Sequence, residues 1–358
     1  MAARRRVHQL MAALSYGDAV SNHALWIRDA LRRAGFDSEI FVEHVHPRMT
    51  GHVRPLWQYP RVSSPETVCL FHFSIGSAAG PLIHALPDKV VTVYHNITPP
   101  EWFLGFRPHL VGLTYHGRRE LSCYVARTSL ALGVSDFNRR DLAAVGFNPT
   151  GVLPIVPDWS LYEGTGSRLT RQLYADDRTN IVFVGRISPN KRIDDVIRAF
   201  AVYQRYSNPR SRLFLVGDHR GYEKYYDRLK EMVEALRLEE VVFTGHVDDD
   251  DLVAYYRLGH LFLCLSEHEG FCVPVLEAMA VGLPIVAYDA GAVAETLRGA
   301  GVLLKDKSPE LVAELMNEIL TCPALRAAIL EGQARVLREM KAVDFDALLL
   351  ERLAPVLA

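Results

Sequence analysis

Short apolar runs alternate with stretches of helical periodicity along the whole chain, and this alternation restricts the fold more than any other feature. The predicted strands of the first half are 7–14, 38–43, 67–73, 89–95 and 130–135. Those of the second half are 180–186, 211–217, 240–245, 260–266 and 284–289. Nearly all-apolar strands rich in Val, Ile and Leu are typical of parallel sheets buried on both faces. The sequence therefore predicts an α/β protein.

The chain has 358 residues, which is more than one hydrophobic core usually supports. The two series of strands predict two doubly wound domains, and prolines and glycines without periodicity place the join within 149–180. We expect an N-terminal domain over 1–160 and a C-terminal domain over 161–340. A C-terminal helix over 341–358 is expected to pack back toward the first domain.

Charge and cysteine content exclude some classes of protein. A formal net charge of −2 and a pI near 6.7 give no indication of a nucleic-acid partner. The five cysteines form no C-x-x-C pair and are odd in number, which favours a reduced, cytoplasmic chain. The N-terminal apolar run is interrupted by His8 and Gln9, so it predicts a buried strand and not a signal peptide.

The segment VFVGRISPNKR (182–192) has the features of an anion-binding loop. Ligands of doubly wound sheets bind beyond the carboxyl ends of the strands. Gly185 ends a predicted strand there, and Arg186 and Lys191 precede the next helix. A glycine lets a ligand approach the backbone, and the two cations favour phosphate. The alternative is a solvated loop with ordinary surface cations.

The segment SEHEGFCVPVLEAMAV (266–281) is more specific. Pro274 suits the first turn of a helix, so the amides of Gly270, Phe271, Cys272 and Val273 are expected at a helix N-terminus, where they can donate to an anion or to sugar oxygens. Glu269 precedes them in the loop and can reach ligand hydroxyls. Glu277 lies among apolar helix residues, where a buried carboxylate needs donors such as the two hydroxyls of a ribose. An exposed helix glutamate is the alternative.

These segments together resemble the family 4 glycosyltransferases, which have the GT-B architecture: two Rossmann-like domains whose parallel sheets face each other across a cleft. The resemblance covers about 180–304 and runs through VFVGRISPNKR, LFLVGD, VVFTGHVDDDDLVAYY, LFLCLSEHEGFCVPVLEAMAVGLPIVAYDAGAVAE and AGVLL. Glu269 and Glu277 fit its E-x7-E signature. Several independent pieces agree in order and spacing, whereas each alone would be weak.

The resemblance implies a role for each matching residue. Arg186 and Lys191 hold the diphosphate of the donor, Glu277 binds its ribose, and Glu269 with the amides after it addresses the sugar and phosphate. Gly245 and His246 lie where the family places the base, and Glu295 fits a later structural glutamate. The implied reaction is a retaining transfer of a hexosyl group from a nucleoside diphosphate (NDP) sugar to a hydroxyl of a saccharide or lipid-linked acceptor, without a cofactor or metal.

The first half of the chain matches the family less closely. Where many members have two glycines, this chain has Gly17 and Asp18. We expect Asp18 to face an acceptor or donor hydroxyl; a helix N-terminal residue favoured by the dipole is as good an interpretation. By resemblance, His95 lies near the transferred sugar. The weaker candidates on the acceptor side are His72, Ser135 and Arg139.

Two metal-like patterns are better explained otherwise. Asp248–Asp251 contain D-x-D but precede helical sequence, which favours helix capping. His44 and His46 have no third ligand in view. No metal site is therefore predicted.

Competing functions and a membrane contact stay open. A GT-B sugar-nucleotide epimerase, a phosphorylase-like enzyme and a degenerate sugar-nucleotide-binding subunit are the alternatives. Peripheral contact with an anionic membrane, or instead an acceptor-site wall, could be formed by Arg4–Arg6, Trp102, Phe103, Leu104, Phe106 and Arg107. SYGDA and YHNITP most resemble bacterial polysaccharide enzymes, which favours a GDP-mannose-like or UDP-hexose donor.

Overall fold

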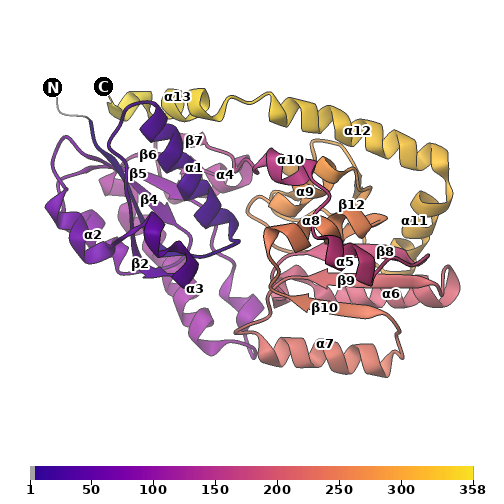
Figure 1. The fold of residues 1–358 in the computed structure, drawn as a ribbon. Coiled ribbons are helices and arrows are strands. Elements are labelled where there is room, and N and C mark those ends of the chain that lie inside the picture. Colours follow the sequence, from indigo (N-terminus) through magenta and orange to yellow (C-terminus); the bar gives the residue numbers. More distant parts are fainter. Residues whose placement is uncertain (1–4, 358) are drawn as a thin grey trace. The chain divides into compact units, whose positions relative to one another are not determined.

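A computed structural model describes residues 5–357, and Arg4 of the basic N-terminal cluster lies outside them. The chain divides into two compact units (Figure 1). Unit 1 comprises 1–101, 109–156 and 343–358, and unit 2 comprises 102–108 and 157–342. Each unit contains one parallel sheet. The predicted pair of doubly wound α/β domains is confirmed.

Unit 1 has a seven-stranded sheet in the order β3-β2-β1-β4-β5-β6-β7. Its strands are β1 (Val7–Leu14), β2 (Ile40–Val45), β3 (Arg54–Pro55), β4 (Val68–Phe73), β5 (Lys89–Tyr94), β6 (Thr128–Gly133) and β7 (Thr150–Val152). Its helices are α1 (Ala19–Arg33), α2 (Ala79–Ala85), α3 (Pro108–Glu120), α4 (Asp136–Val145) and α13 (Phe345–Leu357).

Strand β4 shows how the unit 1 sheet is buried on both faces. Cys69, Phe71 and Phe73 belong to one apolar core, which includes residues of α2. Val68 and Leu70 alternate with them and belong to a second core, shared with α1 and α13. Side chains of a strand point to opposite faces in turn, so a six-residue run that is buried throughout requires cover on both sides. His72 therefore lies on the face of the sheet that α1 covers.

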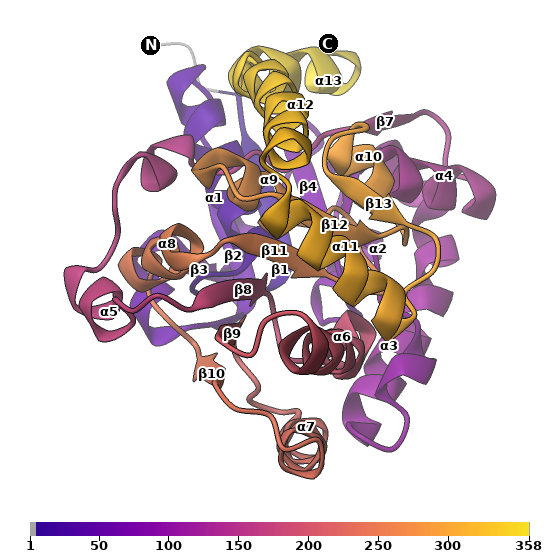
Figure 2. The same ribbon diagram turned by 90° about the vertical axis from the view of Figure 1, so that its right-hand side faces the viewer.

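Unit 2 has a six-stranded sheet in the order β10-β9-β8-β11-β12-β13. Its strands are β8 (Thr179–Val184), β9 (Ser211–Val216), β10 (Val241–Gly245), β11 (Leu261–Cys264), β12 (Ile285–Tyr288) and β13 (Val302–Leu304). Its helices are α5 (Arg168–Leu173), α6 (Ile193–Tyr206), α7 (Glu223–Ala235), α8 (Asp249–Leu258), α9 (Val273–Val281), α10 (Val293–Leu297), α11 (Pro309–Thr321) and α12 (Pro323–Lys341). In Figure 2, α6 and α11 lie side by side beside this sheet, and the two helices are in contact.

The strand order reverses between β8 and β11, which are neighbours in the sheet although two strands separate them in sequence. In unit 1 the order reverses between β1 and β4. Ligands of open α/β sheets bind outside the carboxyl ends of the strands at such a switch point. The loops after β8 and β11 are therefore the place to look for a site in unit 2.

The aromatic segment 102–108 packs within unit 2. The Phe106 and Tyr225 rings meet edge to face at 5.3 Å, and the Arg107 guanidinium lies 5.2 Å from the centre of the Tyr222 ring. Phe103 is buried, whereas Leu104 is 60% exposed. Phe103 and Phe106, two of the residues that could have met a membrane, thus pack on tyrosines of this unit. Among the described residues, no helix is long and apolar enough to cross a bilayer.

Candidate functional site

The loops 185–192 and 265–272 follow the two strands at the switch point of unit 2. The Glu267 amide donates to the Asn190 carbonyl at 2.9 Å, and Asn190 Nδ2 donates to the His268 carbonyl at 3.3 Å. These bonds tie the two loops together. The two segments that the sequence singled out therefore form one site.

Lys191 and Glu269 form an ion pair between the two loops, with 2.6 Å from Nζ to Oε1. Their side chains are 22% and 8% exposed. Burial lowers the Lys191 pKa, but the charge of Glu269 and its hydrogen bond outweigh that effect and raise the pKa overall. An ammonium has three donors, so Lys191 can keep Glu269 and still donate to ligand oxygens.

Arg186 follows Gly185 at the end of β8 and is exposed. Among residues 5–357 its guanidinium forms no ion pair or hydrogen bond, although it interacts electrostatically with Asp218, which is paired with Arg220. The backbone beside it is closely packed: a Cβ on Gly217 would lie 1.9 Å from the Gly185 carbonyl oxygen. A glycine at position 217 therefore lets two strand ends meet beside an unpaired cation.

Helix α9 begins as predicted, with Pro274 in its first turn. Cys272 is its N-cap and has a left-handed backbone, φ 72°. The amides of Phe271, Cys272 and Val273 donate to no acceptor within residues 5–357. Unpaired amides at a helix N-terminus carry a partial positive charge, so this turn can bind an anion.

Glu277 accepts two tyrosine hydroxyls, from Tyr162 at 2.6 Å and from Tyr256 at 2.7 Å. Burial raises its pKa, and the two hydrogen bonds lower it by less. The donors that a buried carboxylate requires are thus supplied by the chain itself. The carboxylate has further lone pairs, and binding of a ribose by Glu277 stays a prediction.

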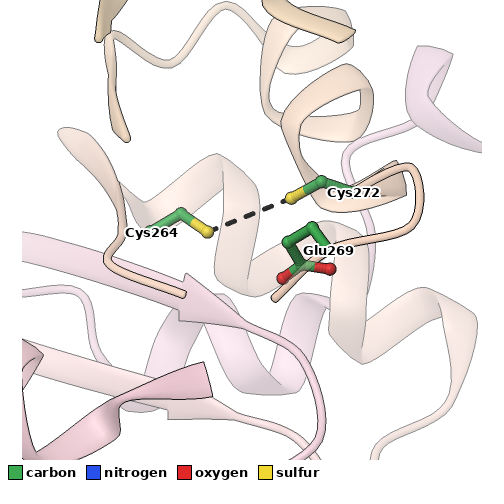
Figure 3. A group of neighbouring side chains, drawn as sticks. All are labelled: Cys264, Glu269 and Cys272. Atoms are coloured by element: carbon green, nitrogen blue, oxygen red, sulfur yellow. Dashed lines mark hydrogen bonds between the residues drawn. The ribbon is translucent and has the colours of Figure 1, made fainter. Parts of the chain in front are cut away.

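A second group gathers beside the ion pair (Figure 3). The sulfurs of Cys264 and Cys272 are 3.9 Å apart. One ligand atom each from Cys264, Glu269 and Cys272 lies within 4.8 Å of the others, and all three residues are buried. Within residues 5–357 this is the group of three or more potential ligands that could hold a metal ion. The prediction of a metal-free site did not consider it.

The other candidates in unit 2 also follow the carboxyl-terminal ends of strands of the sheet. Gly245 ends β10 with φ 70°, and the exposed His246 follows it. Glu295 is an exposed residue of α10. Asp248 caps α8 by accepting from the Asp251 amide at 2.9 Å, so the capping interpretation of the D-x-D pattern is confirmed.

In unit 1, Gly17 and Asp18 follow β1, one of the two strands at the switch point. Asp18 is the N-cap of α1 and accepts from the amide and the hydroxyl of Ser21, at 3.1 and 2.9 Å. Ser135 caps α4. Arg139 is bonded to Asp136 at 2.6 Å. The structure thus shows the helix-terminal interpretation of Asp18, while contact with a ligand stays untested.

His95 and His72 form part of a buried histidine cluster between the sheet and α1. His72 Nδ1 and His95 Nε2 are 2.8 Å apart, and His72 Nε2 lies 2.7 Å from Gln9 Oε1. The His23 ring stands edge-on to His95 at 5.5 Å. Burial lowers the pKa values of His23 and His72 to about 3 and that of His95 well below its ordinary value. All three imidazoles are therefore neutral at neutral pH.

Comparison with known proteins bears on this site. The family described as glycosyl transferases group 1 matches residues 170–335, which hold both switch-point loops. Residues 170–335 are thus similar to the glycosyl transferases group 1 family. The chain also matches a D-inositol 3-phosphate glycosyltransferase of Kineococcus radiotolerans, 31% identical over 222 residues, 56% of this chain and 51% of that protein. An O-antigen chain mannosyltransferase B of Escherichia coli is 27% identical over 232 residues, 60% of this chain and 57% of that protein. The chain thus spans about half the length of these relatives.

Solved structures agree on the fold. A sucrose-phosphate synthase from Thermosynechococcus elongatus has a TM-score of 0.79 at 17% identity, and 99% of each chain is covered. Anabaena HepE in complex with UDP and glucose has a TM-score of 0.76 at 18% identity, again over 99% of each chain. These neighbours are GT-B glycosyltransferases, so the GT-B architecture is confirmed.

Sequence reasoning missed four residues that bond to candidate residues or to their loops, three in unit 2 and one in unit 1. Tyr162 lies in the presumed join and Tyr256 in a helix 21 residues before Glu277, and no spacing connects either with that carboxylate. Asn190 lies between the two predicted cations, and nothing in the motif indicates that it bonds to the second loop. The sequence shows Gln9 only as a polar interruption of an apolar strand. A polar residue in a buried strand needs a hydrogen-bond partner, so this interruption could have indicated a buried polar contact.

Proposed function

We propose that the chain is a retaining hexosyltransferase, which moves a sugar from an NDP-sugar to a hydroxyl of a saccharide or lipid-linked acceptor. The observation that carries the proposal is the pair of joined loops at the switch point of a group 1 region, with Lys191 fixed on Glu269 and Arg186 unpaired. An NDP-sugar fits because its diphosphate needs cations and amides, whereas its sugar needs an acceptor such as a carboxylate.

Each group has a task in this proposal. Arg186 and the two remaining donors of Lys191 bind the diphosphate, together with the amides that begin α9. Glu269 keeps one oxygen on Lys191 and offers the other to a sugar hydroxyl. Glu277 holds the ribose beside its tyrosines, and His95 contacts the transferred sugar. The base lies by Gly245 and His246.

The chemistry consists mainly of stabilising a leaving group. The bond from the anomeric carbon to the diphosphate oxygen breaks, and its electron pair leaves with the diphosphate. The acceptor oxygen forms the new bond from the same face, and its proton passes to the departing phosphate oxygen. Cations and amides that already point at the diphosphate lower the barrier without reorganising. Burial keeps His95 neutral, which suits a hydrogen-bond acceptor better than a base that must become charged.

The relatives guide the choice of substrates. One is named a mannosyltransferase of O-antigen chains, and a structural neighbour holds UDP-glucose. We therefore propose a GDP-mannose-like or UDP-hexose donor, no cofactor, and action in the cytoplasm or at the inner face of a membrane.

A panel of UDP-, GDP- and ADP-sugars tests the proposal. We expect one donor to raise the melting temperature, since a ligand that binds only the folded state stabilises it. The same donor should release nucleoside diphosphate when a saccharide acceptor is present, and NMR of the glycoside should show the donor's anomeric configuration. Nucleotide binding without release would indicate a binding subunit, and an epimerised donor would indicate an epimerase; either result contradicts transfer.

A further inference from the structure

We propose that Cys264, Glu269 and Cys272 form a binding site for one thiophilic divalent metal ion of the zinc class. The three side chains come from the end of β11, the following loop and the N-cap of α9, and they converge on one point (Figure 3). The three residues as a whole are 3%, 7% and 5% exposed, so the site is protected from bulk water.

The separation of the sulfurs suits a shared metal. Zinc–sulfur bonds of about 2.3 Å at a tetrahedral angle place two sulfurs about 3.8 Å apart. The two sulfurs here are 3.9 Å apart without an ion. A disulfide would need sulfurs about 2 Å apart and thus a rearrangement of both side chains. Two thiolates and a carboxylate are also a ligand set that zinc accepts, with a fourth position for water.

The charges close as well. A divalent ion with two thiolates and one carboxylate has a net charge of −1, and the two thiol protons pass to the solvent. The Lys191 ammonium, bonded to Glu269 Oε1, offsets that charge and leaves Oε2 for the metal. If the proposed function holds, a bound ion competes with the donor for Glu269.

Cobalt(II) alone is the probe, added to the intact chain under a phosphine reductant. We expect one equivalent to produce thiolate-to-cobalt charge-transfer absorption that zinc then removes. Cys264→Ser and Cys272→Ser should each weaken binding more than about 100-fold, because loss of a ligand exceeds the 10–100-fold typical of a residue that only orients one. Lys191→Met should weaken it about 10–100-fold and keep the band.

The matched controls are Cys69→Ser, a buried cysteine elsewhere, and Cys123→Ser, an exposed one; both should bind cobalt like the parent. Absence of the band in the parent chain, or a band that Cys264→Ser and Cys272→Ser leave intact, overturns the proposal. A decrease in mass by two hydrogens without bound metal would show a Cys264–Cys272 disulfide, and this result would also overturn the proposal. Absorption is read without turnover, so this result is independent of the proposed transferase activity.

A different observation carries a second inference, which deepens the proposed function: Gln9 and His72 are positioning residues that fix the tautomer of His95. The chain of bonds starts at a backbone carbonyl, because Gln9 Nε2 donates to the Ala24 oxygen at 3.0 Å. A carbonyl can only accept, so the orientation of the Gln9 amide is set. We infer the remaining proton positions from that anchor.

Gln9 Oε1 accepts at 2.7 Å, so the proton of neutral His72 lies on Nε2 and its Nδ1 is bare. His72 Nδ1 then accepts from His95 Nε2 at 2.8 Å, which leaves the His95 Nδ1 lone pair available. That atom is buried and has no partner within residues 5–357. Since a buried polar atom is rarely left unpaired, Nδ1 is the acceptor for a ligand hydroxyl.

Long-range proton–nitrogen NMR of the imidazoles tests these proton positions. In the parent chain we expect both His72 and His95 to carry their proton on Nε2. His72→Leu should let His95 populate both tautomers, whereas His72→Asn keeps an acceptor in place of Nδ1 and should preserve the parent spectrum of His95. His8→Leu, which removes another buried histidine of β1, should also preserve it.

The outcome separates the proton positions from their function. His95 protonated on Nδ1 in the parent chain, or unchanged in His72→Leu, overturns the inference whatever the turnover. If the proton positions are as inferred but His72→Leu leaves turnover at the parent rate, a contribution of the fixed His95 tautomer to transfer is excluded, while the inferred proton positions stand.

Discussion

Removing the charge of Lys191 should destabilise the chain more than removing both charges of the ion pair. Lys191→Met leaves the Glu269 carboxylate, 8% exposed, without its cation, and breaking a buried pair in this way costs about 3–5 kcal/mol. Glu269→Gln should cost less, because the Lys191 side chain is 22% exposed and its flexible stem can reach water. In the double variant no unpaired charge remains, so it should be more stable than Lys191→Met.

The parent, Lys191→Met, Glu269→Gln and the double variant form a double-mutant cycle. Their stabilities are measured by calorimetric unfolding of the intact chain at pH 7. The pKa of Lys191 is raised above its ordinary 10.5, so the contribution of the pair is complete at pH 7 and is lost only as the pH rises through the raised value. The coupling energy should be about 0.5–3 kcal/mol in favour of the double variant. Additive losses, with the double variant the least stable, would refute a buried and coupled pair.

Activity should follow a different order. Lys191→Met and the double variant should both lose about 10²–10³-fold in kcat, the loss typical of removing one donor to a developing charge. Stability recovered without activity separates the structural from the catalytic contribution of Lys191. Parent-level turnover in the double variant would remove Lys191 from the reaction.

Three further changes test individual residues. Burial raises the Glu277 pKa above 4.5, so the contribution of Glu277 to folding stability is fully present below pH 4.5 and is lost as the pH rises through the raised pKa. Glu277→Gln should therefore be more stable than the parent only above about pH 4.5. A difference in stability that does not depend on pH would contradict this. Asp18→Ala should cost about 1 kcal/mol as a lost N-cap, whereas Asp18→Asn should keep stability, so lower turnover in Asp18→Asn alone would indicate contact with a ligand hydroxyl. Gly217→Ala should cost at least about 1–3 kcal/mol in unfolding free energy through its clash with the Gly185 carbonyl, whereas Gly332→Ala, in an open helix position, should gain about 0.5–1 kcal/mol, and equal effects would contradict the close approach.

Local signals predicted the elements that carry the site. The strand 7–14 begins and ends where the sequence places it. Pro274 lies in the first turn of α9 and Asp248 caps α8. Both positions could be predicted, because proline suits the first turn of a helix and aspartate suits its N-cap whatever the tertiary structure. The strands β3, β7 and β13 were not predicted, because two or three residues are too few to show a period.

The partners of the site residues could not be predicted from the sequence. Tyr162 and Glu277 are 115 residues apart and meet only because the chain folds. Gln9, His72 and His95 come from the region of three neighbouring strands, and their bonds depend on strand register. Motifs show which residues follow a strand, but contacts among side chains far apart in sequence follow from the tertiary structure.

The two glutamates of the site are compensated in different ways, and the difference decides where attraction for a diphosphate comes from. Glu277 is held by two neutral hydroxyls and Glu269 by a cation. Because Glu269 already neutralises Lys191, that lysine offers hydrogen bonds without net charge. The charge that draws a diphosphate must then come from Arg186 and from the amides that begin α9, because Asp218, the carboxylate near Arg186, is paired with Arg220. Arg186 should therefore govern how salt weakens donor binding, whereas Lys191 governs the departure of the leaving group.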